Sequence, residues 1–206
     1  MKNWVLLFLF MILGYAQVFA QNEDDIYKDI IIPGTGVAEI TIGTPSQKVL
    51  DILGQPIRKS TFEEETQSLL KRKLTPKTEL VFFLGFDYVI EYSKSANKTY
   101  YPLYTLYFKD EKLIYMILSS YGYDLEKCKK FGISSALFFN DGKENMQKTL
   151  GRSYISTHPT AGNFLYDYFA KGISLFLNKN EIRTMHIYAP LDKRAQRKFL
   201  STSGAR

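Results

Sequence analysis

The chain is poor in the residue types that carry most enzyme chemistry. Its 206 residues include one cysteine, Cys128, and two histidines, His158 and His186. A single thiol cannot pair within its own chain, so a disulfide framework is excluded. Neither histidine belongs to a metal-binding spacing, and Cys128 has no partner at zinc-ligand spacing. The sequence therefore predicts no metal, no cofactor and no catalytic residues, and we expect a protein that is not an enzyme.

An alternative hypothesis is a small hydrolase or thiol enzyme with an unfamiliar site. Cys128 could act with His158 or His186, because the members of a catalytic triad meet in space rather than in sequence. The competing interpretation is that Cys128 lies on the inner face of a short helix, where a free cysteine behaves as a small hydrophobic residue. The glycines of 33–36 lack the third glycine and the preceding strand of a dinucleotide-binding loop, and they indicate a turn.

The chain also lacks an apolar run long enough to span a bilayer. The run from Trp4 to Leu13 has ten residues, whereas a spanning helix needs about 20. It follows Lys2 and leads to the small-x-small sequence of 18–20, so residues 1–20 are predicted to be a cleaved signal peptide. No cysteine stands at the expected mature start, Gln21, which excludes a lipid anchor on an N-terminal cysteine. We expect export to the periplasm or the extracellular space.

The formal charge of +6 is concentrated at the C-terminus. Residues 190–206 hold five basic residues, Lys193, Arg194, Arg197, Lys198 and Arg206, against the single acid Asp192. The body 21–189 is close to neutral. A nucleic-acid-binding protein spreads basic charge over a folded face interleaved with aromatics, so a nucleic-acid partner is not expected. The interpretations are a solvated helical end, or a basic tail that docks on anionic lipid headgroups or an acidic partner.

Two segments, 39–54 and 136–151, repeat one pattern of strand, turn and helix. Gly43 and Asn140 occupy the turns and suit a positive φ. Thr44 and Asp141 are the predicted N-caps of the helices, each with Gln or Glu three residues later in a capping-box arrangement. Gly54 and Gly151 are predicted to end the helices.

The later part of each segment also matches. Residues 106–118 align with 175–187, and both predict two strands joined by a polar tight turn. Residues 88–92 and 164–168 predict a further strand ahead of each hairpin. The fold class is therefore α+β, with two tandem units of strand, short helix and antiparallel meander and with the helices packed on one sheet face.

The repeat sets the expected domain boundaries. An N-terminal segment covers 21–35, the first unit 36–123, the second unit 124–189 and the basic tail 190–206. Between the helix-ending glycine and the hairpin turn the first unit is 28 residues longer than the second. That insertion predicts a helix at about 60–75, with acids in its first turn and bases in its last.

The string Ile42-Gly43-Thr44, the short helix and the following Gly54-Gln55-Pro56 resemble the BamE-type (SmpA/OmlA) envelope module. Two such units in tandem resemble the architecture of the secreted beta-lactamase inhibitor proteins. The resemblance implies a non-catalytic exported module that binds protein. BamE relatives are lipoproteins, and this chain departs from them because no cysteine stands at its expected mature start.

Tyrosines are concentrated in one meander. They are Tyr100, Tyr101, Tyr104, Tyr107, Tyr115, Tyr121 and Tyr123. Strand alternation sends half of them to each sheet face, and helices on one face would leave the other half exposed. Exposed tyrosine is favoured at protein interfaces, whereas simple β propensity is the alternative explanation.

Together these features predict an exported, non-catalytic protein-binding module. The predicted interaction residues are the tyrosines 100, 101, 104, 107 and 115 and the cations Lys193, Arg194, Arg197 and Lys198. Attachment to an anionic ligand or peripheral contact with a membrane through the basic tail is the alternative within the binding class.

Overall fold

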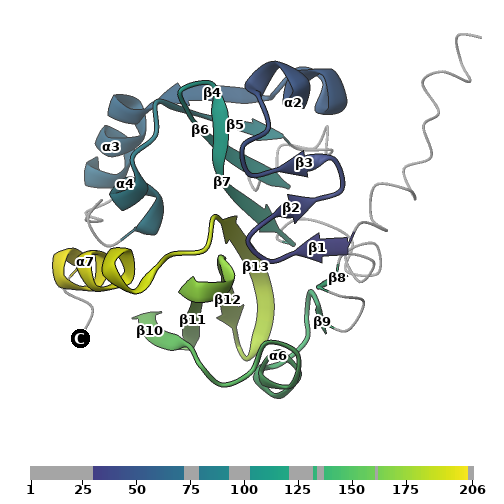
Figure 1. Ribbon diagram of the computed structural model, residues 1–206, viewed down its shortest axis with the longest axis vertical. Helices are drawn as coiled ribbons and strands as arrows, with labels where there is room; N and C mark the ends of the chain where they lie inside the picture. Colours follow the sequence, from purple (N-terminus) through teal and green to yellow (C-terminus); the bar gives the residue numbers. More distant parts are fainter. Residues whose placement is uncertain are drawn as a thin grey trace, which may run out of the picture.

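The computed structural model describes residues 30–71, 79–92, 103–120, 132–133, 137–160 and 162–203. The predicted signal peptide, Cys128, the tyrosines at 100, 101, 121 and 123, and Arg206 lie outside the described residues. Among the described residues, the structure places helices and antiparallel strands in one α+β arrangement, which confirms the predicted fold class (Figure 1).

An eight-stranded antiparallel sheet, sheet B, forms the centre of the molecule. Its order is β10-β11-β12-β13-β7-β6-β5-β4. The strands are β4 (Arg58–Thr61), β5 (Tyr88–Tyr92), β6 (Tyr104–Lys109), β7 (Lys112–Ser119), β10 (Ile155–Thr160), β11 (Asn163–Tyr168), β12 (Ile173–Asn178) and β13 (Glu181–Tyr188). The two meanders meet where β7 pairs with β13. The predicted strands and hairpins of both units are confirmed.

A smaller sheet, sheet A, has the order β3-β2-β1-β8-β9. Its strands are β1 (Ile30–Ile32), β2 (Gly36–Val37), β3 (Ile40–Thr41), β8 (Gly132–Ile133) and β9 (Leu137–Phe138). β1 pairs with β8 in parallel, whereas the other pairs are antiparallel. β1 comes from the expected N-terminal segment, and its pairing with β8 joins the two halves of the chain.

The helices of the repeated pattern are α2 (Ser46–Leu53) and α6 (Lys143–Leu150). The predicted capping boxes are wrong, because the N-caps are Pro45 and Gly142 and neither helix start has a side-chain cap. Thr44 and Asp141 instead reach back three residues and hold the turn between strand and helix. The hydrogen bonds run from Thr41 N–H to Thr44 Oγ1 (3.0 Å) and from Phe138 N–H to Asp141 Oδ2 (2.6 Å).

The turn and helix-end positions follow the sequence pattern. Gly43 has φ 92° and Asn140 has φ 70°, so the predicted positive φ at both turns is confirmed. Gly54 and Gly151 end α2 and α6, as expected, with φ 75° and 87°. Glycine adopts these values at little steric cost.

The two units also anchor their helices to sheet B through matching hydrogen bonds. Each bond joins positions that the two sequence segments place in register. The pairs are Gly43 N–H to Leu113 O (2.7 Å) and Asn140 N–H to Ile182 O (3.0 Å), Leu113 N–H to Thr44 O (2.9 Å) and Ile182 N–H to Asp141 O (3.0 Å), and Tyr92 OH to Gly54 O (3.1 Å) and Tyr168 OH to Gly151 O (2.8 Å). In both halves, a tyrosine hydroxyl therefore binds the C-terminal end of the helix. Two backbone hydrogen bonds hold the turn between the strand and the helix.

Sheet B has a hydrophobic cluster on each face. On the first face, α2, α6 and sheet A pack through residues such as Val49, Met146 and Ile31. On the second face lie α3 (Phe62–Lys71), α4 (Leu80–Leu84) and α7 (Lys193–Ser203). Figure 1 shows these three helices along one side of the sheet, opposite α2 and sheet A. The expectation that one face stays exposed is therefore wrong, since helices outside the repeat cover it.

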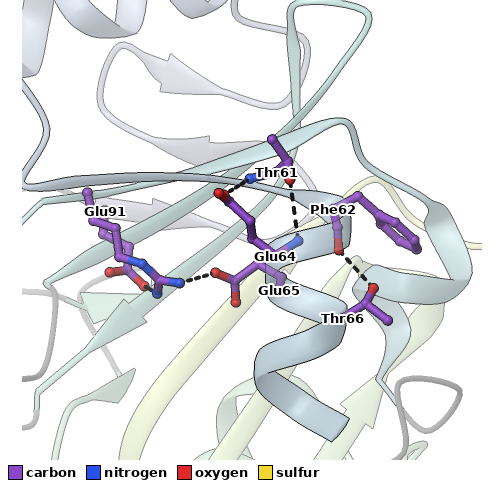
Figure 2. Close-up of polar contacts among 7 residues, drawn as sticks. Thr61, Phe62, Glu64, Glu65, Thr66 and Glu91 are labelled. Carbon is purple, nitrogen blue, oxygen red and sulfur yellow. Dashed lines mark hydrogen bonds and ion pairs between the residues drawn. The ribbon is translucent and has the colours of Figure 1, made fainter. Parts of the chain in front are cut away.

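The predicted insertion helix is confirmed as α3, and its N-terminus is held by a capping box (Figure 2). Thr61 N–H donates to Glu64 Oε2 at 2.8 Å, and Glu64 N–H donates to Thr61 Oγ1 at 3.3 Å. Arg58 of the neighbouring strand β4 forms ion pairs with Glu65 of α3 and Glu91 of β5. These contacts fix α3 against the edge of sheet B.

Replacing Thr61 with alanine is expected to lower the free energy of unfolding by about 1 kcal/mol, because the Glu64 N–H loses its acceptor. Urea denaturation would measure the change as a lower midpoint, with the same dependence of the unfolding free energy on urea concentration. Thr61→Ser keeps the hydroxyl and is the control. Equal stability of the alanine and serine variants would contradict this role of Thr61.

Candidate functional site

Of the tyrosines predicted as interaction residues, the structure describes Tyr104, Tyr107 and Tyr115, and their rings are enclosed or half-buried. Tyr104 and Tyr115 each have 4% of their surface exposed, and Tyr107 is half-buried. Tyr104 belongs to the first-face cluster, whereas Tyr107 and Tyr115 pack under α4 in the second. The Tyr107 ring lies 4.9 Å from that of Phe86. The prediction that these three tyrosines form an exposed binding face is wrong, because the first-face cluster encloses Tyr104 and the helices α3, α4 and α7 cover Tyr107 and Tyr115.

The second face instead carries a row of polar side chains on three adjacent strands. Asp167 of β11 is paired with Ser174 of β12, and Ser174 is paired with His186 of β13. Residues paired in this way point to the same side of a sheet. This row was missed in the sequence, because only the strand register brings the three side chains together.

His186 is half-buried on its strand, between the buried residues Met185 and Ile187. Its Nδ1 shares a hydrogen bond of 2.8 Å with the Tyr115 hydroxyl, and its Nε2 lies 3.3 Å from the Thr184 hydroxyl. Burial lowers the pKa of His186 to about 4, so the ring is neutral near pH 7. The imidazole therefore acts as a neutral hydrogen-bonding group.

Asp167 is buried, and the pKa of its carboxyl is higher than usual. Burial raises the pKa of its carboxyl to about 6, against a smaller lowering by a hydrogen bond from Ser174. Ser174 Oγ also shares a hydrogen bond of 2.7 Å with the Tyr188 hydroxyl. The negative charge of Glu79, at the start of α4, raises the pKa of Asp167 further.

The order of the row does not match nucleophilic catalysis. A serine triad places histidine between serine and acid, so that the imidazole can accept the serine proton. Here Ser174 lies between Asp167 and His186, and its hydroxyl bonds to Tyr188 while His186 bonds to Tyr115. The arrangement is a hydrogen-bonded layer between the sheet and the helices.

The remaining candidate catalytic residues are His158 and Cys128. His158 lies in the edge strand β10 (Ile155–Thr160), and its side chain lies outside the described part of the chain. Cys128 lies outside the described residues, and its pairing with either histidine stays a prediction. Among the described residues, no three of the types His, Cys, Asp and Glu gather in a way that could hold a metal ion.

The predicted basic tail forms the helix α7, which is packed against the second face of sheet B. Asp192 Oδ1 accepts a hydrogen bond of 2.7 Å from Ala195 N–H and so caps the helix. Phe199 is 5% exposed, and its ring lies 5.4 Å from Phe83 and 5.6 Å from Phe169. Leu191, just before the helix, is also buried. The segment is part of the folded body and its helical character is as predicted.

The opposite side of α7 carries the predicted cations. Lys193, Arg194, Arg197 and Lys198 are all exposed. Among the described residues none of the four forms an ion pair with an acid, and Lys198 Nζ lies 5.9 Å from the centre of the Phe83 ring. We call these four residues the basic face of α7. It is a fixed cluster of positive charge on the molecular surface.

Large apolar side chains are also exposed in places. On the outer side of β1, Ile30 is 50% exposed and Ile32 is 54% exposed. Ile30 has Gly132 as its partner in β8, and Ile32 has Gly36 as its partner in β2, so each has a glycine beside it on one neighbouring strand. Ile52 on α2, Ile57 just before β4 and Leu70 on α3 are exposed singly. Single exposed apolar residues are ordinary, so only the β1 pair is a second candidate surface.

Comparison with known protein families, characterised proteins and solved structures gives no match to this chain. Within the described residues, none of the helices is both long and apolar enough to cross a membrane.

Proposed function

We propose that the protein is an exported, non-catalytic binding protein whose docking surface is the basic face of α7. The observation that carries this proposal is the exposure of four cations, without acidic partners among the described residues, on a helix that is fixed to the core by Phe199. Fixed charges of one sign attract and orient a partner of opposite sign. The expected partner therefore presents a negatively charged surface.

The proposal keeps the predicted export and the predicted duplication of a BamE-like unit. Matching hydrogen bonds at aligned positions support the duplication. The binding surface differs from the first hypothesis, because Tyr104 and Tyr115 are buried and Tyr107 is half-buried.

The polar row beneath the helices supports the non-catalytic part of this proposal. Asp167, Ser174 and His186 bond within the molecule, and their order does not prepare a nucleophile. An enzyme built on Cys128 is the competing function, and an unchanged rate of any detected reaction in Cys128→Ala would exclude it.

The test is crosslinking capture with the mature chain, residues 21–206, from cell envelope and culture fluid. The bait variants are a quadruple glutamine variant of the basic face (Lys193→Gln, Arg194→Gln, Arg197→Gln, Lys198→Gln) and a matched control. The control removes four exposed cations elsewhere (Lys48→Gln, Lys112→Gln, Lys148→Gln, Arg152→Gln). Removing all of α7 would expose the cluster around Phe199, so charge neutralisation replaces deletion.

We expect the natural chain and the control to retain one anionic binding component, and the α7 variant to lose it. Thermal unfolding would show that all three baits are equally folded. Retention of the component by the α7 variant would overturn the proposal and direct attention to other surfaces, such as the exposed pair Ile30 and Ile32.

A further inference from the structure

We infer that the surface bound by α7 is an anionic membrane, with the basic face lying against lipid phosphate groups. This inference rests on the proposed function and names its partner. It follows from three properties of α7: the spacing of its cations, the composition of its exposed side, and the use of its apolar side inside the protein.

The spacing places the four charges in one compact patch. Lys193 and Arg197 are four residues apart, as are Arg194 and Lys198, so each pair lies on neighbouring turns of the helix. At a rise of 1.5 Å per residue the patch is about 8 Å long. A patch of this length can lie parallel to a flat surface with all four charges close to it. Basic clusters of this kind on amphipathic helices are typical of binding to anionic lipid.

The composition of the exposed side favours lipid over a protein partner. The structure describes the whole of α7, and its exposed residues are the four cations with Ser201 and Thr202. The centre of a protein interface is rich in aromatic residues and depleted in lysine. This side of α7 has two lysines and no exposed aromatic or aliphatic residue. It therefore lacks the apolar anchor that a stable protein complex needs.

The apolar side of α7 is already occupied. Phe199 is buried between Phe83 and Phe169, and Leu200 packs in the same cluster. Membrane-surface helices normally insert their apolar side into the lipid. Here that side holds the helix to sheet B, so attachment depends on charge alone. We therefore expect reversible binding that weakens strongly with salt, because exposed charges are screened.

Cosedimentation with lipid vesicles tests the inference with the mature chain, residues 21–206. One vesicle is phosphatidylcholine alone, and the other contains one third phosphatidylserine. The protein is expected to bind only the second, and less as salt is raised. Each basic residue near an anionic surface contributes about fivefold to affinity, so the quadruple glutamine variant of the basic face should bind on the order of several hundredfold more weakly.

The matched control on Lys48, Lys112, Lys148 and Arg152 removes the same net charge and is expected to bind nearly as well as the natural chain. Equal loss in both variants would show that net charge alone drives binding and would overturn the inference. Failure of the natural chain to bind the anionic vesicle would overturn it too. If an acidic protein is then captured through α7, the proposed function stands, whereas no capture contradicts both.

Discussion

Replacing Gly172 with alanine is expected to lower the free energy of unfolding by about 3–5 kcal/mol, which is a large share of a typical domain's stability. Gly172 has φ 67°, and a Cβ there would lie 2.2 Å from the Tyr188 carbonyl oxygen and 2.6 Å from the Gly34 Cα. Both are backbone atoms, so no side chain can rotate away. The variant should melt about 10 °C lower, as measured by circular dichroism.

The close approach at Gly172 joins two parts of the molecule. Its carbonyl oxygen accepts hydrogen bonds from Gly34 N–H at 3.2 Å and from Tyr188 N–H at 3.1 Å. The turn after β1 thus contacts the end of β13, just before α7. A larger residue at this position would separate sheet A from the strand that leads into α7.

Gly54→Ala is the matched control for this prediction. Gly54 has a similar φ of 75°, but a Cβ there meets none of the described atoms within 4 Å. Its alanine variant carries only the cost of placing a Cβ on a backbone with φ 75° and ψ −154°, about 1–3 kcal/mol, without a close contact. If Gly172→Ala and Gly54→Ala lose equal stability, the close approach does not limit the fold.

Asp167→Asn is expected to stabilise the protein by about 3 kcal/mol at pH 8 and to change its stability little at pH 4. Burial raises the pKa of Asp167 from 3.8 to about 6. The folded state therefore holds a proton that the unfolded state has released between these pH values. Stability of the natural chain falls as pH rises through this window, and it stays low above it. Asparagine is neutral throughout and removes the loss.

His186 produces the opposite trend, which the comparison must separate. Burial lowers its pKa from 6.5 to about 4, so its contribution to stability is present above pH 6.5 and is lost as pH falls toward 4. Both chains contain His186, so its effect cancels in their difference. Urea denaturation from pH 4 to 8 would give that difference at each pH. A difference that does not change with pH would contradict a raised pKa at Asp167.

The local chemistry of the chain decided the elements of the fold. Alternating apolar residues predicted strands 88–92 and 164–168, and the polar turns after residues 109 and 178 predicted the two hairpins. Positive φ at Gly43 and Asn140 also followed from residue type. These features depend on neighbours within a few positions, so the sequence expresses them directly. The capping prediction failed because Thr44 and Asp141 had a nearer acceptor role in the preceding turn.

Only the tertiary structure decided which surfaces the protein presents. Tyr107 and Tyr115 are covered by α3, α4 and α7, so the burial of Tyr115 depends on helices far along the chain from it. Register between β11, β12 and β13 brought Asp167, Ser174 and His186 together. The basic residues of the C-terminus were visible in the sequence as charge. Their role as one outward-facing side of α7 arises because Phe199 fills a space between helices and sheet, a long-range contact that no local pattern determines.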